Sequence, residues 1–270
     1  MKLHYRTYGP QGPPLLIVHG MYGSGDNWAG IARELASDFT VYAIDQRNHG
    51  QSGHSMEHNY QVLRDDLCEF MDEHGLAKAV LIGQSMGGKA VMSFAMECAH
   101  RVAALISVDI APRSYNDLAL ESRSAANHGK MIDAMLRVDL SRIASREDAD
   151  QVLRTSIGSD RIRSFLLKNL KRQRDGSYRW ALNLPALKEN LDAIMDGLDV
   201  TDLLEEGGIT GFPVLFVAGE RSDYIRPEDH GLIRDLFPGA QIVTIPGAGH
   251  WVHAEQPELL VKNIRYFLDV

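Results

Sequence analysis

The segment Gly83-Gln84-Ser85-Met86-Gly87 decides the fold of this chain because of its surroundings. An apolar run at 79–82 precedes it, and a helix-like run at 88–99 follows it. A G-x-S-x-G motif between a strand and a helix is typical of a sharp turn that exposes a serine hydroxyl at the strand tip. The outer glycines avoid collisions in such a turn, and a helix beginning at Met86 directs free N–H groups toward the serine. We therefore interpret Ser85 as a nucleophile, not as an incidental serine in a glycine-rich turn.

Length and composition are those of an ordinary globular protein. The 270 residues, 44% hydrophobic and 24% charged, are enough for one α/β domain with or without an insertion. No stretch reaches membrane-spanning length, and the first six residues do not resemble a signal peptide. The two cysteines, Cys68 and Cys98, stand in helix-like segments, so we expect free thiols and neither a disulfide scaffold nor a metal cluster. These features predict a cytoplasmic protein.

Strand and helix patterns alternate through the first 112 residues. Strands are expected at 15–18, 40–44, 79–82 and 104–110, with an edge strand at 3–8. Helices are expected between them at 27–36, 60–74 and 88–99. The apolar runs are continuous rather than alternating, which is typical of strands covered on both faces. The pattern predicts an α/β protein with a mostly parallel sheet and helices on both of its faces.

The alternation stops between residues 113 and 197. That segment shows amphipathic helical patterns and no strong strand pattern. The alternation of strand and helix patterns then resumes, with strands expected at 214–217 and 241–245 and helices at 227–237 and 257–268. We therefore expect a core formed by residues 1–112 and 198–270, and a helical lid formed by residues 113–197 inserted into it.

A serine hydroxyl needs a base to remove its proton, and a carboxylate to orient that base. Among eleven histidines, His250 is the best candidate, since it follows the last expected strand in the loop Gly-Ala-Gly-His. His253, three residues further on, instead suits a helix start. Two acids remain open: Asp109 ends the strand after the elbow, and Asp223 follows the next strand. Either strand tip can reach the base.

Acyl transfer also needs donors for the oxyanion that develops on the substrate. We expect these donors to be the backbone N–H groups of Met86, beside the nucleophile, and of Met21, in the loop after His19-Gly20. His19 and His49 each precede a glycine in a turn, so we interpret both as structural residues that bond loop backbone. The chemistry requires neither a cofactor nor a metal.

Charge is distributed unevenly along the chain. The formal net charge of −8 argues against nucleic acid as a partner, yet residues 113–190 hold 15 Lys or Arg against 10 Asp or Glu. The densest part of this segment contains Arg161, Arg163, Lys168, Lys171, Arg172 and Arg174. These side chains are either solvated helix faces or a basic insertion that attracts an anionic substrate.

Several motifs together resemble one family. They are His19-Gly20-Met21-Tyr22-Gly23-Ser24, Asp45-Gln46-Arg47-Asn48-His49-Gly50-Gln51-Ser52, Gly83-Gln84-Ser85-Met86-Gly87-Gly88-Lys89, Val108-Asp109-Ile110-Ala111-Pro112 and Gly249-His250-Trp251-Val252-His253-Ala254-Glu255. With these motifs the chain resembles the YbfF-type esterases of the α/β-hydrolase superfamily, from about residue 3 to its last residue.

The resemblance implies the α/β-hydrolase fold with a helical lid. It also implies Ser85 as nucleophile, His250 as base and Asp109 as acid, with hydrolysis of short acyl esters and some acyl-thioester activity. Two positions depart from the family pattern. Gln84 replaces the histidine common before the serine, which we expect to alter local hydrogen bonds without touching the triad. Asp223 stands beside Ser222, where the family has no aspartate.

The leading hypothesis is a serine hydrolase that cleaves short to medium acyl esters, or acyl thioesters such as acyl-CoA, through an acyl-enzyme on Ser85. Its partner is then a small molecule, with neither nucleic acid nor membrane. The alternatives are a ligand-binding receptor that retains the triad, and a C–C or amide hydrolase on the same scaffold. A dehalogenase or an epoxide hydrolase needs aspartate as the elbow nucleophile, so serine at 85 argues against both.

Overall fold

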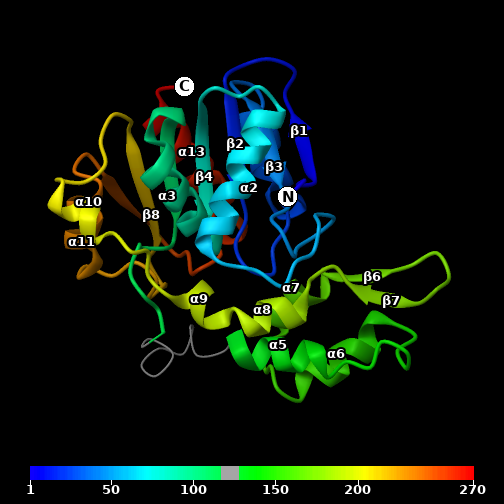
Figure 1. Cartoon of the computed structure of the whole chain (residues 1–270). Coiled ribbons are helices and arrows are strands. Elements are labelled where there is room, and N and C mark those ends of the chain that lie inside the picture. Colours follow the sequence, from blue (N-terminus) through cyan, green and yellow to red (C-terminus); the bar gives the residue numbers. More distant parts are fainter. Residues whose placement is uncertain (117–127) are drawn as a thin grey trace.

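Seven strands form one twisted sheet, which the computed structural model describes within residues 1–116 and 128–270 (Figure 1). They are β1 (Tyr5–Tyr8), β2 (Pro14–Val18), β3 (Thr40–Ile44), β4 (Ala79–Gln84), β5 (Val102–Val108), β8 (Val214–Gly219) and β9 (Gln241–Ile245). Their order in the sheet is β1-β3-β2-β4-β5-β8-β9, and only the edge strand β1 runs antiparallel to its neighbour. The predicted parallel α/β architecture is confirmed.

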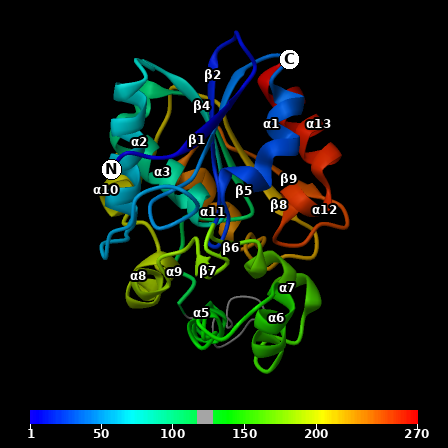
Figure 2. The same ribbon diagram turned by 90° about the vertical axis from the view of Figure 1, so that its right-hand side faces the viewer.

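Helices cover both faces of this sheet (Figure 2). On one face lie α2 (Tyr60–Glu73), α3 (Met86–Cys98) and α11 (Asp229–Leu236), and on the other lie α1 (Ala29–Leu35) and α13 (Pro257–Leu268). Each strand packs against both helix layers, because successive side chains point to opposite faces of the sheet. In β2, Leu16 and Val18 pack toward α2 and α3, whereas Leu15 and Ile17 pack toward α1 and α13. This double burial explains the unbroken apolar run in the sequence.

Between β5 and β8 the chain leaves the sheet and forms a separate layer across one of its ends (Figure 1). We call residues 113–197 the insertion. Its described elements are α5 (His128–Leu136), α6 (Arg146–Arg154), α7 (Asp160–Leu167), β6 (Leu170–Arg172), β7 (Tyr178–Trp180), α8 (Leu184–Glu189) and α9 (Leu191–Met195). The short helix α10 (Thr201–Glu205) leads back to β8.

The β6–β7 hairpin corrects the expectation that this segment lacks strands. Leu170 pairs with Trp180 and Arg172 with Tyr178, and Gly176 in the turn has φ of 88°, which favours glycine. Each strand is three residues long. So short a run cannot display the alternation by which a strand is recognised in a sequence.

The two cysteines lie on neighbouring helices of the core. Cys68 on α2 and Cys98 at the end of α3 have sulfur atoms 3.7 Å apart, and both thiols are free, as expected. None of the helices within residues 1–116 and 128–270 combines the length and the apolar character that a membrane span needs.

A buried ion pair fastens the loop after β3 to α2. Arg47 in that loop donates from Nε and Nη2 to the two carboxylate oxygens of Asp66, at 2.6 and 2.8 Å, and the side chains are 8% and 3% exposed. A bidentate pair of this kind satisfies both charges where water cannot. The same loop supplies His49, whose Nε2 lies 3.3 Å from the Tyr22 N–H.

We therefore predict that Asp66→Ala lowers the free energy of unfolding by about 3–5 kcal/mol, because the Arg47 guanidinium stays buried without its partner. The neighbouring change Asp65→Ala is the matched control, since the Asp65 side chain is 61% exposed and should matter by less than about 1 kcal/mol. Urea denaturation of both variants measures the difference. Equal stability of the two variants would contradict the structural role of the pair.

Candidate active site

Ser85 occupies the turn between β4 and α3 with φ of 53° and ψ of −122°. This positive φ is costly for a residue with a side chain and is typical of strained functional turns. The turn needs glycine on both sides, because a Cβ at Gly83 would collide with the Gly87 carbonyl, and a Cβ at Gly87 with the Val18 carbonyl. The Ser85 N–H donates to the Val108 carbonyl at 3.0 Å, which ties the turn to β5.

The structure brings Ser85, His250 and Asp109 into one hydrogen-bonded series. Ser85 Oγ lies 3.0 Å from His250 Nε2, and His250 Nδ1 lies 2.8 Å from Asp109 Oδ2. Because the carboxylate can only accept, Nδ1 carries the proton and Nε2 is free to accept from the serine hydroxyl. These contacts join residues 165 and 141 positions apart in the chain. This is the geometry by which a base activates a serine.

Asp109, rather than Asp223, contacts the imidazole. Asp109 is fully buried at the end of β5 and also accepts hydrogen bonds from the Gly219 N–H, at 2.9 Å, and from the Ser222 hydroxyl. Asp223 is exposed, and its backbone carbonyl accepts from Arg113. The end of β8 and the loop after it thus supply the donors that hold the Asp109 carboxylate in place.

The two residues expected to supply oxyanion donors both lie near the serine. Met86 is the first residue of α3, where helix N–H groups have no partner within the helix, and Met21 lines the same cavity as Ser85. The loop that carries Met21 is braced by the Gly23 N–H, which donates to the Gly20 carbonyl at 3.0 Å, and by the Tyr22 N–H, 3.3 Å from His49 Nε2.

His19 and His49 have the structural role that their sequence context indicates. His19 Nδ1 lies 2.7 Å from the Gly20 carbonyl, and its Nε2 accepts from the Gln46 N–H at 3.0 Å. His49 Nδ1 lies 2.9 Å from the Arg47 carbonyl. Burial lowers the pKa of both imidazoles, so they stay neutral and brace the loop without adding charge near the serine. His253 lies in α12 (Val252–Glu255) and stacks on Trp28.

Gln84 touches the base, contrary to the expectation that it leaves the triad alone. Its Nε2 lies 3.4 Å from His250 Nε2 and donates to the His250 backbone carbonyl at 3.3 Å. The residue immediately before Ser85 therefore helps to hold the loop that carries His250.

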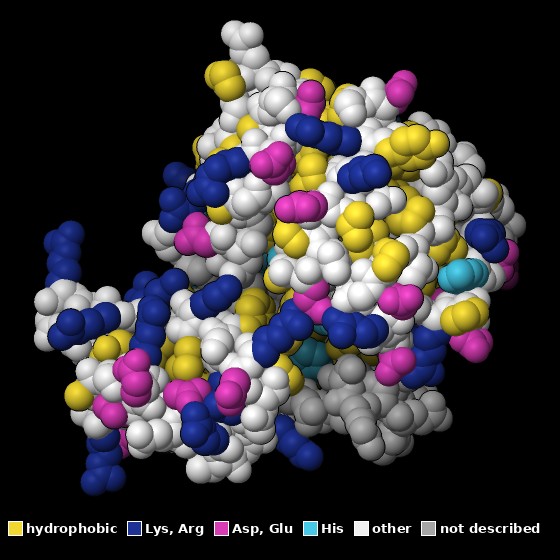
Figure 3. Space-filling view, turned by 180° about the vertical axis from the view of Figure 1, so that it is seen from behind, with side chains coloured by type: hydrophobic (Ala, Val, Ile, Leu, Met, Phe, Trp, Pro, Cys, Tyr) yellow, Lys and Arg dark blue, Asp and Glu magenta, His cyan; other side chains and the backbone are white. Residues whose placement is uncertain are grey.

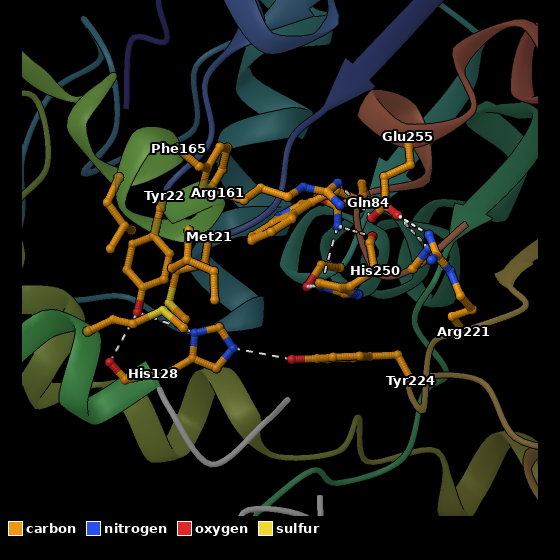
Figure 4. A pocket seen from close by; sticks show the side chains of 16 residues that line it. Met21, Tyr22, Gln84, His128, Arg161, Phe165, Arg221, Tyr224, His250 and Glu255 are labelled. Atoms are coloured by element: carbon orange, nitrogen blue, oxygen red, sulfur yellow. Dashed lines mark hydrogen bonds and ion pairs between the residues drawn. The ribbon is translucent and has the colours of Figure 1, made fainter. Parts of the chain in front are cut away.

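Three aromatic residues at the site were not expected from the sequence. Tyr224 stacks on His250, with ring centroids 3.7 Å apart, and His128 from the insertion lies between Tyr224 and Tyr22 (Figure 4). Burial, reinforced by the nearby His250, lowers the pKa of His128 to about 4, so this imidazole is neutral at ordinary pH. Tyr22 belongs to a quoted motif, but no pattern in the sequence links it to His128 and Tyr224, because their contacts join distant segments.

Ser85 and His250 open into a cavity of about 400 Å³ between the core and the insertion. Its apolar lining combines core and insertion residues, namely Met21, Met131, Ile162, Phe165, Leu166 and Trp251. A cavity of this size with a few convergent polar groups is typical of a site for a small molecule.

Charged side chains gather at the mouth of this cavity. Arg161 from α7 and Arg221 from the loop after β8 both contact the Glu255 carboxylate, at 2.8 and 3.2 Å. Figure 3 shows Lys and Arg side chains along the junction of core and insertion. Of the six basic residues singled out in the sequence, Arg161 alone lines the cavity. Arg163 is buried in ion pairs with Asp150 and Asp160, so it is not available to a ligand.

Comparison with known proteins identifies the family of this chain. A family model described as "alpha/beta hydrolase fold" matches residues 13–257. The chain is 33% identical to Esterase YbfF of Escherichia coli, with all of both chains covered, and 36% identical to the zebrafish sn-1-specific diacylglycerol lipase ABHD11, with all of this chain and 83% of the relative covered. A solved structure described as a marine microorganism esterase superposes with a TM-score of 0.91 at 42% identity, over 98% of this chain and 99% of that one.

A parallel sheet whose strand ends assemble a serine, a histidine and an aspartate defines a hydrolase that works by acyl transfer. The chain belongs to the α/β-hydrolase family, within which it is a YbfF-type esterase. It is thus a serine hydrolase of the carboxylesterase class, and its substrates are small-molecule esters.

We predict that Asp109→Asn lowers kcat by about 10⁴-fold, because an amide in place of the carboxylate favours the tautomer whose Nε2 already carries a proton. Asp223→Asn should stay within about threefold of the native chain, as expected of an exposed side chain without contact to the base. Steady-state hydrolysis of p-nitrophenyl acetate measures both, with melting temperatures as the folding control. The opposite ranking of the two variants would refute Asp109 as the acid.

Proposed function

We propose that this chain hydrolyses carboxylic esters of short to medium acyl chains, and acyl thioesters such as acyl-CoA, through an acyl-enzyme on Ser85. The observation that carries the proposal is the contact series from Ser85 through His250 to Asp109 at the floor of an apolar cavity of about 400 Å³. In this proposal Ser85 is the nucleophile, His250 the general base and Asp109 the residue that orients it.

In the acylation half, Ser85 Oγ attacks the ester carbonyl while its proton passes to His250 Nε2. The carbonyl oxygen becomes an oxyanion, which the N–H groups of Met21 and Met86 stabilise. When the tetrahedral intermediate collapses, the C–O or C–S bond to the leaving group breaks. His250 returns the proton to the departing alcohol or thiol, and the acyl group remains on Ser85.

In the deacylation half, a water molecule takes the place of the alcohol. His250 Nε2 removes a proton from the water, and the resulting hydroxide attacks the acyl-enzyme carbonyl at the same oxyanion site. Collapse of the second intermediate releases the carboxylic acid and restores the Ser85 hydroxyl. Every proton thus passes through Nε2 of one imidazole. Its Nδ1 keeps its own proton, which remains hydrogen-bonded to the Asp109 carboxylate throughout.

We infer that the insertion, residues 113–197, is a lid over this site and that residues 1–112 and 198–270 are the catalytic core. The support is the cavity lining, since Met131, Ile162, Phe165 and Leu166 of the insertion face Met21 and Trp251 of the core. Phe165 packs on Trp251 with ring centroids 5.1 Å apart. Such an apolar enclosure excludes water and holds an acyl chain of limited length.

We predict that Ser85→Ala lowers the hydrolysis of p-nitrophenyl acetate by at least about 10⁴-fold and that the native chain turns over many times. In a series of p-nitrophenyl esters from acetate to palmitate, kcat/KM should be highest for short and medium chains and lower by at least about tenfold for palmitate. A single slow turnover with retained product would contradict the enzyme and indicate a receptor. A maximum at palmitate would contradict the proposed acyl range.

The two arginines at the cavity mouth favour an anionic leaving group. Arg161 and Arg221 share one carboxylate, Glu255, so the three side chains together leave one positive charge beside the site. Both arginines are more than half exposed, with 53% and 65% of their side-chain surface accessible. An anionic substrate is attracted by such a charge over a distance of about 8 Å at physiological salt.

We therefore predict that salt weakens the hydrolysis of acetyl-CoA more than that of p-nitrophenyl acetate, because salt screens only the charged substrate. The double change Arg161→Gln with Arg221→Gln should remove this difference while the neutral ester is still hydrolysed. The measurement is kcat/KM for both substrates between low and high sodium chloride. Equal salt responses in the native chain would rule out electrostatic attraction by these arginines.

A further inference from the structure

Tyr224 and the base His250 lie face to face. The ring centroids are 3.7 Å apart and the planes differ by 19°, so the phenol covers one face of the imidazole (Figure 4). Tyr224 is 5% exposed and lines the cavity that contains Ser85. The nucleophile and the acid contact the edge of the same imidazole through its two nitrogens. The two hydrogen bonds hold the imidazole at its edge, and the stacked phenol adds a contact on its face that opposes tilting of the ring out of its plane.

Tyr224 is itself held at both ends. Its backbone carbonyl accepts from the Tyr115 hydroxyl at 2.6 Å, and its N–H donates to Ser222 Oγ at 3.3 Å. Its own hydroxyl lies 3.2 Å from His128 Nε2 in the insertion. A buried hydroxyl, two backbone contacts and a packed ring leave this side chain little rotational freedom.

The hydrogen-bond directions around His128 are mutually consistent. The Tyr22 hydroxyl donates to the His128 carbonyl at 3.3 Å, so its oxygen can accept from His128 Nδ1, also at 3.3 Å. A neutral imidazole with its proton on Nδ1 has a free lone pair on Nε2, which accepts from the Tyr224 hydroxyl. Each donor thus has one acceptor, and the Tyr224 ring is anchored at its far end.

We propose that Tyr224 is a positioning residue for His250: its phenol face keeps the imidazole in the plane that reaches both Ser85 and Asp109. The proposal rests on the proposed function, in which His250 is the base. When His250 takes up the serine proton, the imidazolium lies against the negative face of an aromatic ring, a favourable contact for a cation. The ring therefore supports the base in both of its protonation states.

The experiment compares Tyr224→Phe, which keeps the ring, with Tyr224→Leu, which removes it. For p-nitrophenyl acetate, Tyr224→Leu should lower kcat by about 100-fold and leave KM within about threefold, because misplacement of a catalytic group by about 1 Å acts on the chemical step. Tyr224→Phe should stay within about threefold of native kcat. Tyr266→Leu, the same loss of a ring at a side chain 85% exposed on α13, is the control.

A kcat of Tyr224→Leu within threefold of the native value would overturn the proposal. Equal losses of kcat in Tyr224→Phe and Tyr224→Leu would also overturn it, because the hydroxyl rather than the ring would then be needed for activity. If Tyr224→Leu does not fold, Tyr224→Met takes its place with the same expectations, since methionine fills the space without a flat face. Ser85→Ala is assayed in parallel. Native hydrolysis that persists in Ser85→Ala would refute the proposed function, whereas an active Ser85-dependent enzyme that tolerates Tyr224→Leu refutes the positioning role alone.

Discussion

A buried carboxylate at the end of β5 is the interaction on which the rest of the site depends. Asp109 has no exposed surface, so its oxygens must be satisfied by protein donors. Those donors come from two other segments: Gly219 ends β8 and Ser222 lies in the loop after it, whereas His250 follows β9. One carboxylate thereby ties together three neighbouring strand ends. The parallel sheet makes this possible, because it brings the carboxyl ends of its strands to one edge.

Much of this arrangement could be predicted from the sequence because local geometry dictates it. The turn at Ser85 needs glycines at positions 83 and 87, so the five-residue motif is enough to predict Ser85 as the candidate nucleophile. His250 can be predicted as the candidate base from its position after the last strand. Local pattern alone leaves both Asp109 and Asp223 open as the acid, because they follow adjacent strands, and only the family resemblance points to Asp109. Which of the two side chains points inward depends on how the loop after β8 folds, and its Ser222 hydroxyl turns toward Asp109.

What the sequence does not reveal lies mainly in contacts across the chain. The stacking of Tyr224 on His250 and the contact of His128 with Tyr22 join distant segments without a shared motif. The basic segment illustrates the same limit. Charge density alone cannot distinguish Arg161, which faces the cavity, from Arg163 two residues later, which is buried against aspartates. Helical spacing places these two side chains on different faces of α7.

The histidines near the site other than His250 have lowered pKa values, which supports the proposal that a single imidazole transfers the protons of the reaction. Burial lowers the pKa values of His19 and His49, and brings those of His58 and His253 to about 3. Burial is the largest cause in each case, and it outweighs the opposing charge of Asp45 at His19 and of Glu255 at His253. These imidazoles therefore act as fixed dipoles that brace the loops. Among the residues that the structure describes, His250 combines a carboxylate partner, contact with the Ser85 hydroxyl and access to the cavity, which supports the proposal that it accepts the serine proton.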